Sequence, residues 1–255
     1  MTFLDAAILG VVEGVTEFLP ISSTGHLILT STLLGITQTS FHKSFEIAIQ
    51  LGAIASVIFL YWKSFLNIEI LKRLAVAFLP TAIIGFTLYR LVKSYFIGNN
   101  ELVLWALFLG GSALIAFELW HREEEGATAS VGSISYLQAA TIGLFQSIAL
   151  VPGVSRSAAT IVGGLIMCLK RTTIVEFSFL LAVPTTLAAT GYDLLNTAST
   201  FSFEQGGMLA VGFIAAFVVA LLAIKFLLHY IQTHTFIPFG IYRIAVAALF
   251  FFFVL

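Results

Sequence analysis

Long apolar stretches alternate with short polar loops along most of the chain. A helix that crosses the hydrocarbon core of a bilayer needs about 20 mostly apolar residues. Six stretches meet this requirement, at residues 44–62, 74–95, 101–120, 174–194, 207–230 and 236–255. The pattern therefore predicts an all-α polytopic membrane protein.

Two further apolar regions, 3–35 and 134–168, are each interrupted near the middle. The interruptions are LPISSTGH at 19–26 and VPGVSRSAAT at 151–160, which combine proline and glycine with hydroxyl residues. Each flank is too short to cross a bilayer, and irregular backbone at membrane depth survives only where protein or a water-filled cavity surrounds it. Both regions are therefore predicted to be re-entrant helix–loop–helix hairpins.

The two interrupted regions also resemble each other at a spacing close to half the chain. With one residue of slippage, three pairs align: Gly10 with Gly143, Glu13 with Gln146, and Pro20 with Pro152. Within a single membrane domain of residues 1–255, the first repeat would cover 1–122 and the second 134–255. Each repeat then holds one hairpin and three transmembrane helices, and this odd number of spans inverts the second copy. The expected architecture is an inverted-topology repeat.

Lysine and arginine in short loops indicate which side of the membrane is cytoplasmic. The loops 63–73, 121–133 and 169–173 carry such residues, and all three fall on one predicted side. The opposite side carries Lys43 and Lys93. Both chain ends are therefore expected to face outward, although the small margin leaves a dual-topology protein open.

The composition excludes several classes of protein. Hydrophobic residues make up 59% of the 255 residues and charged residues only 10%, whereas soluble domains are about 25% charged. The net charge of −1 gives no general attraction to nucleic acid. The single cysteine, Cys168, excludes an intramolecular disulfide framework. The N-terminus lacks the pattern of a signal peptide and is expected to stay in the mature protein.

Two carboxylates in the first hairpin are candidates for chemistry. Glu13 and Glu17 are four residues apart and share one helix face. Ionisable residues within a membrane segment usually have a function, because desolvating them is costly. A shared proton, a cationic partner or a divalent cation would stabilise the pair, and hard oxygen ligands suit Mg²⁺ or Ca²⁺. Alternatively, the pair faces outward at the hairpin mouth.

The first interruption adds hydroxyl groups and a histidine. Ser22, Ser23 and Thr24 precede the second helix of the hairpin, where such residues cap helices. The same helix start offers free N–H groups to a phosphate. His26 lies about one turn after Ser23, so it is either a structural histidine or part of the same site.

The second interruption adds a cation. Arg156 lies between Ser155 and Ser157 in an otherwise apolar region, with Thr160 about one turn beyond. Its planar guanidinium suits phosphate oxygens, or it pairs with a carboxylate of the first hairpin. A metal, an arginine and a histidine together indicate phosphoryl transfer.

These segments resemble a known family. VVEGVTEFLPISSTGH and VPGVSRSAATIVGGL are similar to the two signature segments of the undecaprenyl pyrophosphate phosphatases, also called bacitracin-resistance proteins, and residues 45–57 and 176–184 support the match. The resemblance covers essentially the whole chain. It implies a hydrolase of the bacterial plasma (inner) membrane that removes the terminal phosphate of the C55 isoprenoid pyrophosphate. The undecaprenyl phosphate released is the carrier lipid of peptidoglycan synthesis, and the active site would face the outer side.

The resemblance also implies roles for particular residues. The implied catalytic residues are Ser23, His26, Arg156 and Glu17. The implied pyrophosphate-binding residues are Ser22, Thr24, Ser155, Arg156, Ser157 and Thr160. The implied ligands of a divalent cation, Mg²⁺ or Ca²⁺, are Glu13 and Glu17. Ala158 departs from the expected glycine and removes no functional group. The nucleophile is left open between Ser23, His26 and water, and Ser23 with His26 as its base is favoured.

The main alternative is an inverted-repeat transporter or flippase for a lipid phosphate or a small anion. Broken helices fit both readings, and the two carboxylates with His26 could relay protons. A transporter alone does not require hydroxyls and a histidine opposite an arginine. Membrane lipids are the expected partners and nucleic acid is not. A homodimer, the preferred metal and the selectivity for isoprenoid chain length are left open.

Overall fold

The computed structural model describes residues 1–255 apart from residue 38 and residues 96–99, 123–125, 198–205 and 254–255. Its α-helices are α1 (Phe3–Thr16), α2 (Ser23–Leu33), α3 (Ser40–Tyr61), α4 (Ile68–Tyr95), α5 (Asn100–Trp120), α6 (Tyr136–Gln146), α7 (Arg156–Ile166), α8 (Arg171–Thr197), α9 (Gly206–Tyr230) and α10 (Ile237–Phe253). Short 3₁₀ helices are η1 (Ser64–Leu66), η2 (Val131–Ser133) and η3 (Ser147–Leu150). Within the described residues, an isolated bridge between Thr128 and Leu169 is the only β pairing.

The six predicted membrane spans each coincide with a helix. Among the described residues, α3, α4, α5, α8 and α9 are long and apolar enough to cross a bilayer. The sixth, α10, is apolar but has 17 described residues, slightly fewer than the usual 20. The prediction of an all-α polytopic membrane protein is confirmed.

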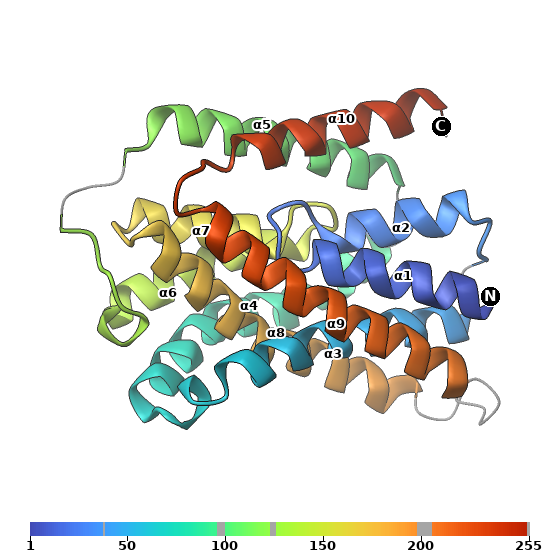
Figure 1. Cartoon of the computed structure of the whole chain (residues 1–255), viewed down its shortest axis with the longest axis horizontal. Coiled ribbons are helices and arrows are strands. Elements are labelled where there is room, and N and C mark those ends of the chain that lie inside the picture. Colours follow the sequence, from blue (N-terminus) through green and yellow to red (C-terminus); the bar gives the residue numbers. More distant parts are fainter. Residues whose placement is uncertain (38, 96–99, 123–125, 198–205, 254–255) are drawn as a thin grey trace.

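Two hairpins of short helices pack against these long helices. The first consists of α1 and α2, with 14 and 11 residues, and the second of α6, η3 and α7, with 11 residues in each α-helix. Figure 1 shows the two hairpins entering from opposite ends of the molecule, so that their turns meet near its middle. A hydrogen bond of 2.8 Å from the Ser157 hydroxyl to the Phe18 carbonyl joins the two turns.

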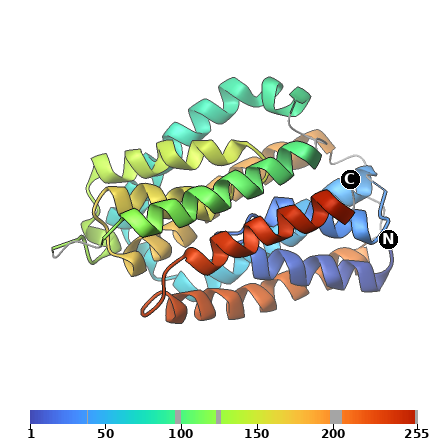
Figure 2. The same ribbon diagram turned by 90° about the horizontal axis from the view of Figure 1, so that it is seen from above.

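Small residues allow the helices to approach closely. At the crossing of α5 and α10, a Cβ added to Gly111 would lie 2.7 Å from the Gly240 carbonyl oxygen, and the converse distance is also 2.7 Å. Close backbone approach at small residues is a common way for helices to associate in membranes. Figure 2 shows α5 and α10 side by side, and this pair covers one side of the hairpins.

A hydrophobic core holds the first turn against α8. Phe18 and Phe179 are both almost fully buried, and their rings meet edge to face with centroids 5.3 Å apart. Such aromatic pairs contribute about 0.5–1.5 kcal/mol beyond the area that they bury. The residue before Phe18 is Glu17, so this contact also fixes the position of the Glu17 backbone.

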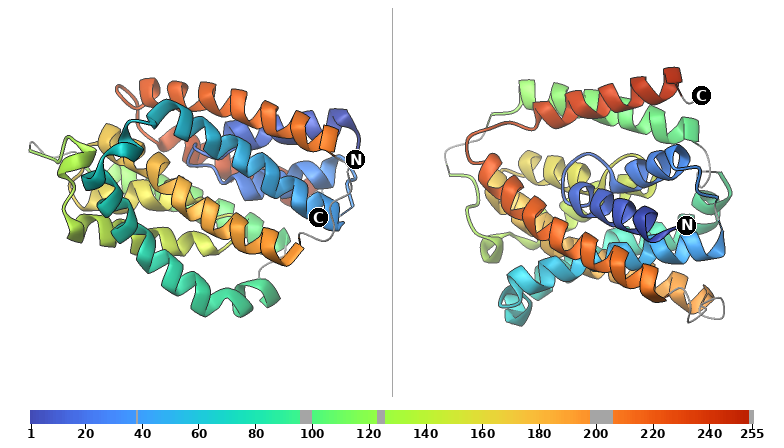
Figure 3. Two further views of the ribbon diagram at one scale, coloured as in Figure 1. Left: turned by 90° about the horizontal axis from the view of Figure 1, so that it is seen from below. Right: turned by 45° about the vertical axis from the view of Figure 1, so that its right-hand side comes forward.

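The loops predicted to be cytoplasmic gather at one end of the bundle. The described residues of these loops, 63–73, 121–122, 126–133 and 169–173, lie at the end opposite the two chain termini (Figures 1 and 3). There Arg171 forms an ion pair of 2.5 Å with Glu118. The side chains of Lys43 and Lys93 fall outside the described residues. Which end faces the cytoplasm stays a prediction.

Candidate active site

A cavity of about 230 Å³ lies where the turns of the two hairpins meet α3 and α8. Its polar lining comes from separate parts of the chain: Glu17, Ser22, Ser23, Thr24, Gln50, Ser155, Arg156, Thr185 and Thr186. Several convergent polar groups in a concave site are typical of a ligand or active site. The hydroxyls, the amide and the guanidinium can all donate hydrogen bonds to an anion.

Both turns end on a serine in the left-handed region of backbone conformation. Ser22 and Ser155 each have a φ of 73°, which is uncommon for a residue with a side chain. The Ser22 hydroxyl accepts a bond of 3.4 Å from the Gly25 N–H, and the Ser155 hydroxyl accepts one of 3.2 Å from the Ala158 N–H. Each serine therefore caps the helix that follows, and the first turns of α2 and α7 both border the cavity.

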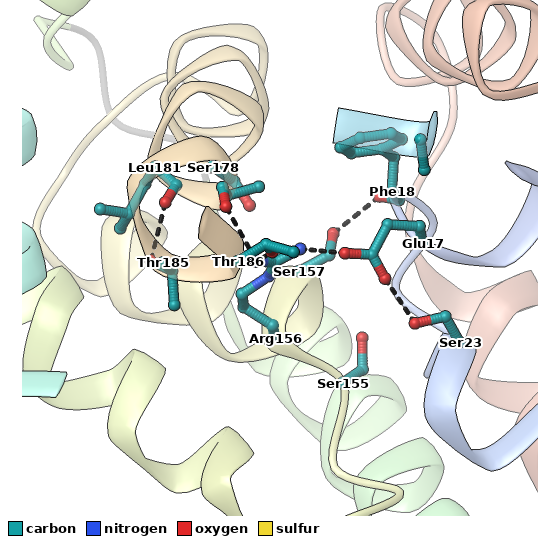
Figure 4. A network of polar contacts seen from close by, with 12 residues as sticks. Glu17, Phe18, Ser23, Ser155, Arg156, Ser157, Ser178, Leu181, Thr185 and Thr186 are labelled. Carbon is teal, nitrogen blue, oxygen red and sulfur yellow. Dashed lines mark hydrogen bonds and ion pairs between the residues drawn. The ribbon is translucent and has the colours of Figure 1, made fainter. Parts of the chain in front are cut away.

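An ion pair joins the two hairpins across the cavity. The Arg156 guanidinium donates to Oε1 of Glu17 (Figure 4). The Ser23 hydroxyl donates to the other oxygen, Oε2, at 2.5 Å. One carboxylate thus holds both the candidate nucleophile and the candidate phosphate-binding cation. These three side chains are the centre of the site.

Arg156 is also held from the opposite side by α8. Its Nη1 group donates to the Thr186 hydroxyl at 2.5 Å and to the Ala182 carbonyl at 3.2 Å. The guanidinium therefore lies between a carboxylate of the first hairpin and polar groups of α8. An anion that enters the cavity would compete with Glu17 for this cation.

Ser157 and Thr160 do not line the cavity. The Ser157 hydroxyl bonds the Phe18 carbonyl, and the Thr160 hydroxyl lies 2.6 Å from the Ser178 hydroxyl. Their contacts hold α7 against the first turn and against α8. Direct contact of either side chain with pyrophosphate stays a prediction.

His26 is buried beside the turn, and its ring nitrogens contact groups other than the Ser23 hydroxyl. Its Nδ1 atom lies 2.8 Å from the Ser22 carbonyl oxygen, which only accepts, so Nδ1 carries the hydrogen. Its Nε2 atom lies 3.0 Å from the Tyr242 hydroxyl, and the two rings stack with an interplanar angle of 7°. Both ring nitrogens are thus occupied, and His26 is not among the residues that line the cavity. A role for it as the base of Ser23 stays a prediction.

Glu13 lies one turn before Glu17 and is fully buried. Both oxygens of the Glu13 carboxylate are without a hydrogen-bond partner, and the charged groups that face it are Glu17, Arg156 and Glu46. Its counterpart in the second hairpin, Gln146, is satisfied instead: its amide donates to Thr81 at 2.9 Å. The first hairpin therefore carries a buried carboxyl group without a hydrogen-bond partner, at a position where the second carries a bonded amide.

The carboxylates fit a divalent cation only in part. Among the described residues, no three His, Cys, Asp or Glu side chains are grouped to hold a metal. Mg²⁺, however, commonly uses one or two carboxylates together with phosphate oxygens of the substrate. The orphaned Glu13 oxygens, one turn from Glu17, are suited to that arrangement.

Sequence analysis did not single out several polar residues of the site. Gln50, Thr185 and Thr186 come from the middle of spans α3 and α8, and Tyr242 comes from α10. A polar side chain inside an apolar span is itself a signal of function. That signal was present, but only the fold shows that these side chains face the hairpin turns.

Comparison with known proteins identifies a family and several relatives that match this chain. The family model described as "Bacitracin resistance protein BacA" matches residues 6–249. An undecaprenyl-diphosphatase of Sulfurihydrogenibium sp. is 54% identical over 98% of this chain and 99% of that protein. Proteins with the same name from Wolinella succinogenes and Persephonella marina are 51% and 50% identical, over 99% and 100% of this chain and 98% and 100% of those proteins.

Proposed function

The chain belongs to the bacitracin resistance protein BacA family, and from this premise we propose that it is an undecaprenyl-diphosphatase of the bacterial inner membrane. The proposed reaction removes the terminal phosphate of undecaprenyl pyrophosphate and returns undecaprenyl phosphate to cell-wall synthesis. The observation that carries the proposal is the contact of Glu17 with both Ser23 and Arg156 in one polar cavity. The relatives that carry this enzyme name cover the chain from end to end.

Substrate binding would begin with an exchange of partners at Arg156. The terminal phosphate takes the place of Glu17 on the guanidinium, because a phosphate accepts the two parallel N–H bonds of an arginine. The N–H groups at the start of α2 and α7 face the same anion. Thr186 and the Ala182 carbonyl keep Arg156 in position during this exchange.

Released from Arg156, Glu17 becomes the better acceptor for the Ser23 proton. The Ser23 oxygen attacks the terminal phosphorus, the bond from that phosphorus to the bridging oxygen breaks, and undecaprenyl phosphate leaves. Water then attacks the phosphoserine, inorganic phosphate departs, and Ser23 regains a proton. A nucleophile activated by an adjacent base is the usual arrangement for such covalent catalysis. Glu17, not His26, is the residue that contacts the Ser23 hydroxyl.

A divalent cation, Mg²⁺ or Ca²⁺, is part of the proposal. Glu13 and Glu17 would hold it with the pyrophosphate oxygens, and it would neutralise the charge on the phosphates. The support is a balance of charge: the cavity offers Arg156 as its lining cation, and Glu13 lies unpaired beside it. The single positive charge of Arg156 does not neutralise the negative charges that a pyrophosphate and two carboxyl groups can carry.

The proposal includes an inverted-topology repeat. Its support is that corresponding parts of the two halves make corresponding contacts. The helix α1 packs on α9 as α6 packs on α4, and both turns end on a serine with the same φ.

We place the basic loops on the cytoplasmic side by the positive-inside rule. The opposite end, where both chain termini lie, would then face outward. The first hairpin enters from that end, so the cavity would receive its lipid from the outer leaflet. Hydrolysis there would lower the amount of undecaprenyl pyrophosphate available to bacitracin and so confer resistance.

The test is phosphate release from undecaprenyl pyrophosphate by the purified protein in detergent, with EDTA or with added Mg²⁺ or Ca²⁺. We expect release that depends on the cation and that is lost in Arg156→Ala. A matched control is Arg73→Ala, because Arg73 bonds the Ile134 carbonyl at the far end of the bundle. Absence of release by a folded wild-type sample, together with lipid-phosphate flux in proteoliposomes, would overturn the phosphatase in favour of a transporter.

A further inference from the structure

A fully buried arginine, Arg243 of α10, bonds the turns of both hairpins. Its guanidinium donates to the Pro20 carbonyl at 3.4 Å and to the Gly153 carbonyl at 3.0 Å. A third bond of 3.0 Å goes to the Ala106 carbonyl of α5. The side chain has no exposed surface, so it meets neither lipid nor solvent.

The two carbonyls occupy corresponding places in the two turns. Pro20 lies two residues before Ser22, and Gly153 lies two residues before Ser155. These serines are the two caps with a φ of 73°, from which α2 and α7 begin. One guanidinium therefore fixes the start of both helices that border the cavity.

A contribution to folding stability does not explain why a charged guanidinium is buried at this position. Burying a charge is costly unless it is paired and fully hydrogen-bonded. Arg243 bonds neutral carbonyls, and its Nε atom has no hydrogen-bond partner. A well-packed hydrophobic side chain often stabilises a protein as much as a buried charge does.

We propose that Arg243 is a positioning residue, which sets the separation of Ser23 and Arg156 by bridging the two hairpin turns. It acts through the backbone, since it is not among the residues that line the cavity. The inference rests on the proposed phosphatase function. A misplacement of about 1 Å in an active site can lower turnover about 100-fold, so losing this bridge should lower kcat much more than it changes KM.

Two kinds of variant remove the bridge. Arg243→Met removes the charge, and Arg243→Lys keeps it but loses the planar fork. Gly110→Ala keeps the arginine but displaces its guanidinium, because a Cβ on Gly110 would overlap the end of that group. The overlap is with side-chain atoms and not with backbone, so Gly110→Ala should still fold.

Matched controls make the same changes elsewhere. Arg73→Met removes an arginine that bonds a loop carbonyl at the far end of the bundle. Gly85→Ala adds a methyl group in the middle of α4, where the nearest atom, from Leu150, would be at an ordinary 3.4 Å. Neither residue borders the cavity.

The first readout is kcat and KM for phosphate release. We expect kcat to fall about 100-fold in Arg243→Met and about 10-fold in Gly110→Ala and Arg243→Lys, with KM changed by less than about threefold. Both controls should keep the wild-type kcat. Unchanged kcat in folded Arg243→Met and Gly110→Ala would overturn the proposal, and so would a rise in KM with kcat intact.

The second readout does not depend on activity. Spin labels at Leu33→Cys and Ile166→Cys, both exposed and at the ends of α2 and α7, report the distance between the two hairpins in a Cys168→Ala background. We expect the distance distribution to broaden or shift in Arg243→Met and Gly110→Ala, and to stay unchanged in the controls. An unchanged distribution contradicts the bridge even if activity falls. A changed distribution with an inactive wild type would contradict the phosphatase function and leave the bridge standing.

Discussion

Glu17 and Arg156 are 139 residues apart in the chain and form an ion pair that links the two hairpin turns. The Glu17 carboxylate is nine-tenths buried, and four-fifths of the Arg156 side chain is buried. Buried pairs of this kind cost free energy to desolvate, and removing one partner leaves an uncompensated charge. The pair is therefore suited to exchange: an anionic substrate can replace Glu17 on Arg156, but nothing neutral can.

The Ser23 hydroxyl is expected to be essential because its contact with Glu17 marks it as the nucleophile. Ser23→Ala should lower kcat at least about 100-fold, since no other group takes over a missing nucleophile, and should leave the protein folded. The matched control is Ser147→Ala, in the other hairpin, where the hydroxyl bonds the Gly143 carbonyl one turn earlier in the chain. Steady-state phosphate release checks both variants. Comparable losses in the two would show that hairpin integrity, and not Ser23, limits the reaction.

Glu13 should govern the requirement for a cation. Glu13→Gln copies Gln146 of the second hairpin and removes a buried carboxyl group that has no hydrogen-bond partner. We expect the concentration of Mg²⁺ or Ca²⁺ that gives half-maximal activity to rise at least about tenfold, because loss of a carboxylate ligand weakens cation binding. In EDTA the thermal stability should stay the same or increase, because a buried polar group without a hydrogen-bond partner is destabilising.

A cation titration of activity, together with thermal unfolding in EDTA, measures both effects of Glu13→Gln. Gln146→Glu is the matched change in the other hairpin, and it should lower stability without improving cation binding. If Glu13→Gln lost activity at every cation concentration with no change in the half-maximal value, the assignment of Glu13 as a ligand would be wrong.

Loss of the Tyr242 hydroxyl should lower kcat slightly, because this hydroxyl contacts the His26 ring. Tyr242→Phe removes the bond to Nε2 but keeps the stacked ring. One neutral hydrogen bond contributes about 1 kcal/mol, which corresponds to a loss of kcat of about fivefold. The matched control is Tyr230→Phe, because the Tyr230 ring packs on Phe239, and this change should leave kcat unaltered. An increase in kcat would instead mean that Tyr242 restrains His26 from acting as a base, and His26→Ala should then lose as much activity as Ser23→Ala.

The sequence predicted the elements better than the contacts between them. Apolar length located the six spans, because crossing a bilayer sets the length of a helix. The proline and hydroxyl breaks at 19–26 and 151–160 located both turns, because an apolar helix rarely contains such a run. The pairing of Arg156 with Glu17 was one of two alternatives, and the structure shows it.

Other contacts could not be read from the sequence. Thr186, Tyr242 and Arg243 are polar residues within apolar spans, and only tertiary packing brings them to the hairpin turns. The orientation of His26 depends on Tyr242, which is 216 residues away. The relation between the two halves was visible as three aligned pairs, but the contacts that α1 and α6 make with the spans require coordinates.

The glycines at corresponding places in α1 and α6 test that packing. A Cβ on Gly10 would lie 2.5 Å from the Gly212 carbonyl oxygen of α9, and one on Gly143 would overlap the Ala77 carbonyl of α4. Because backbone must move in each case, Gly10→Ala and Gly143→Ala should both lower the free energy of unfolding by about 1–3 kcal/mol. Gly85→Ala, which meets only an ordinary contact, should not. Thermal unfolding of the three detergent-purified variants measures this, and wild-type stability of either α1 or α6 variant would contradict close packing of that hairpin on its span.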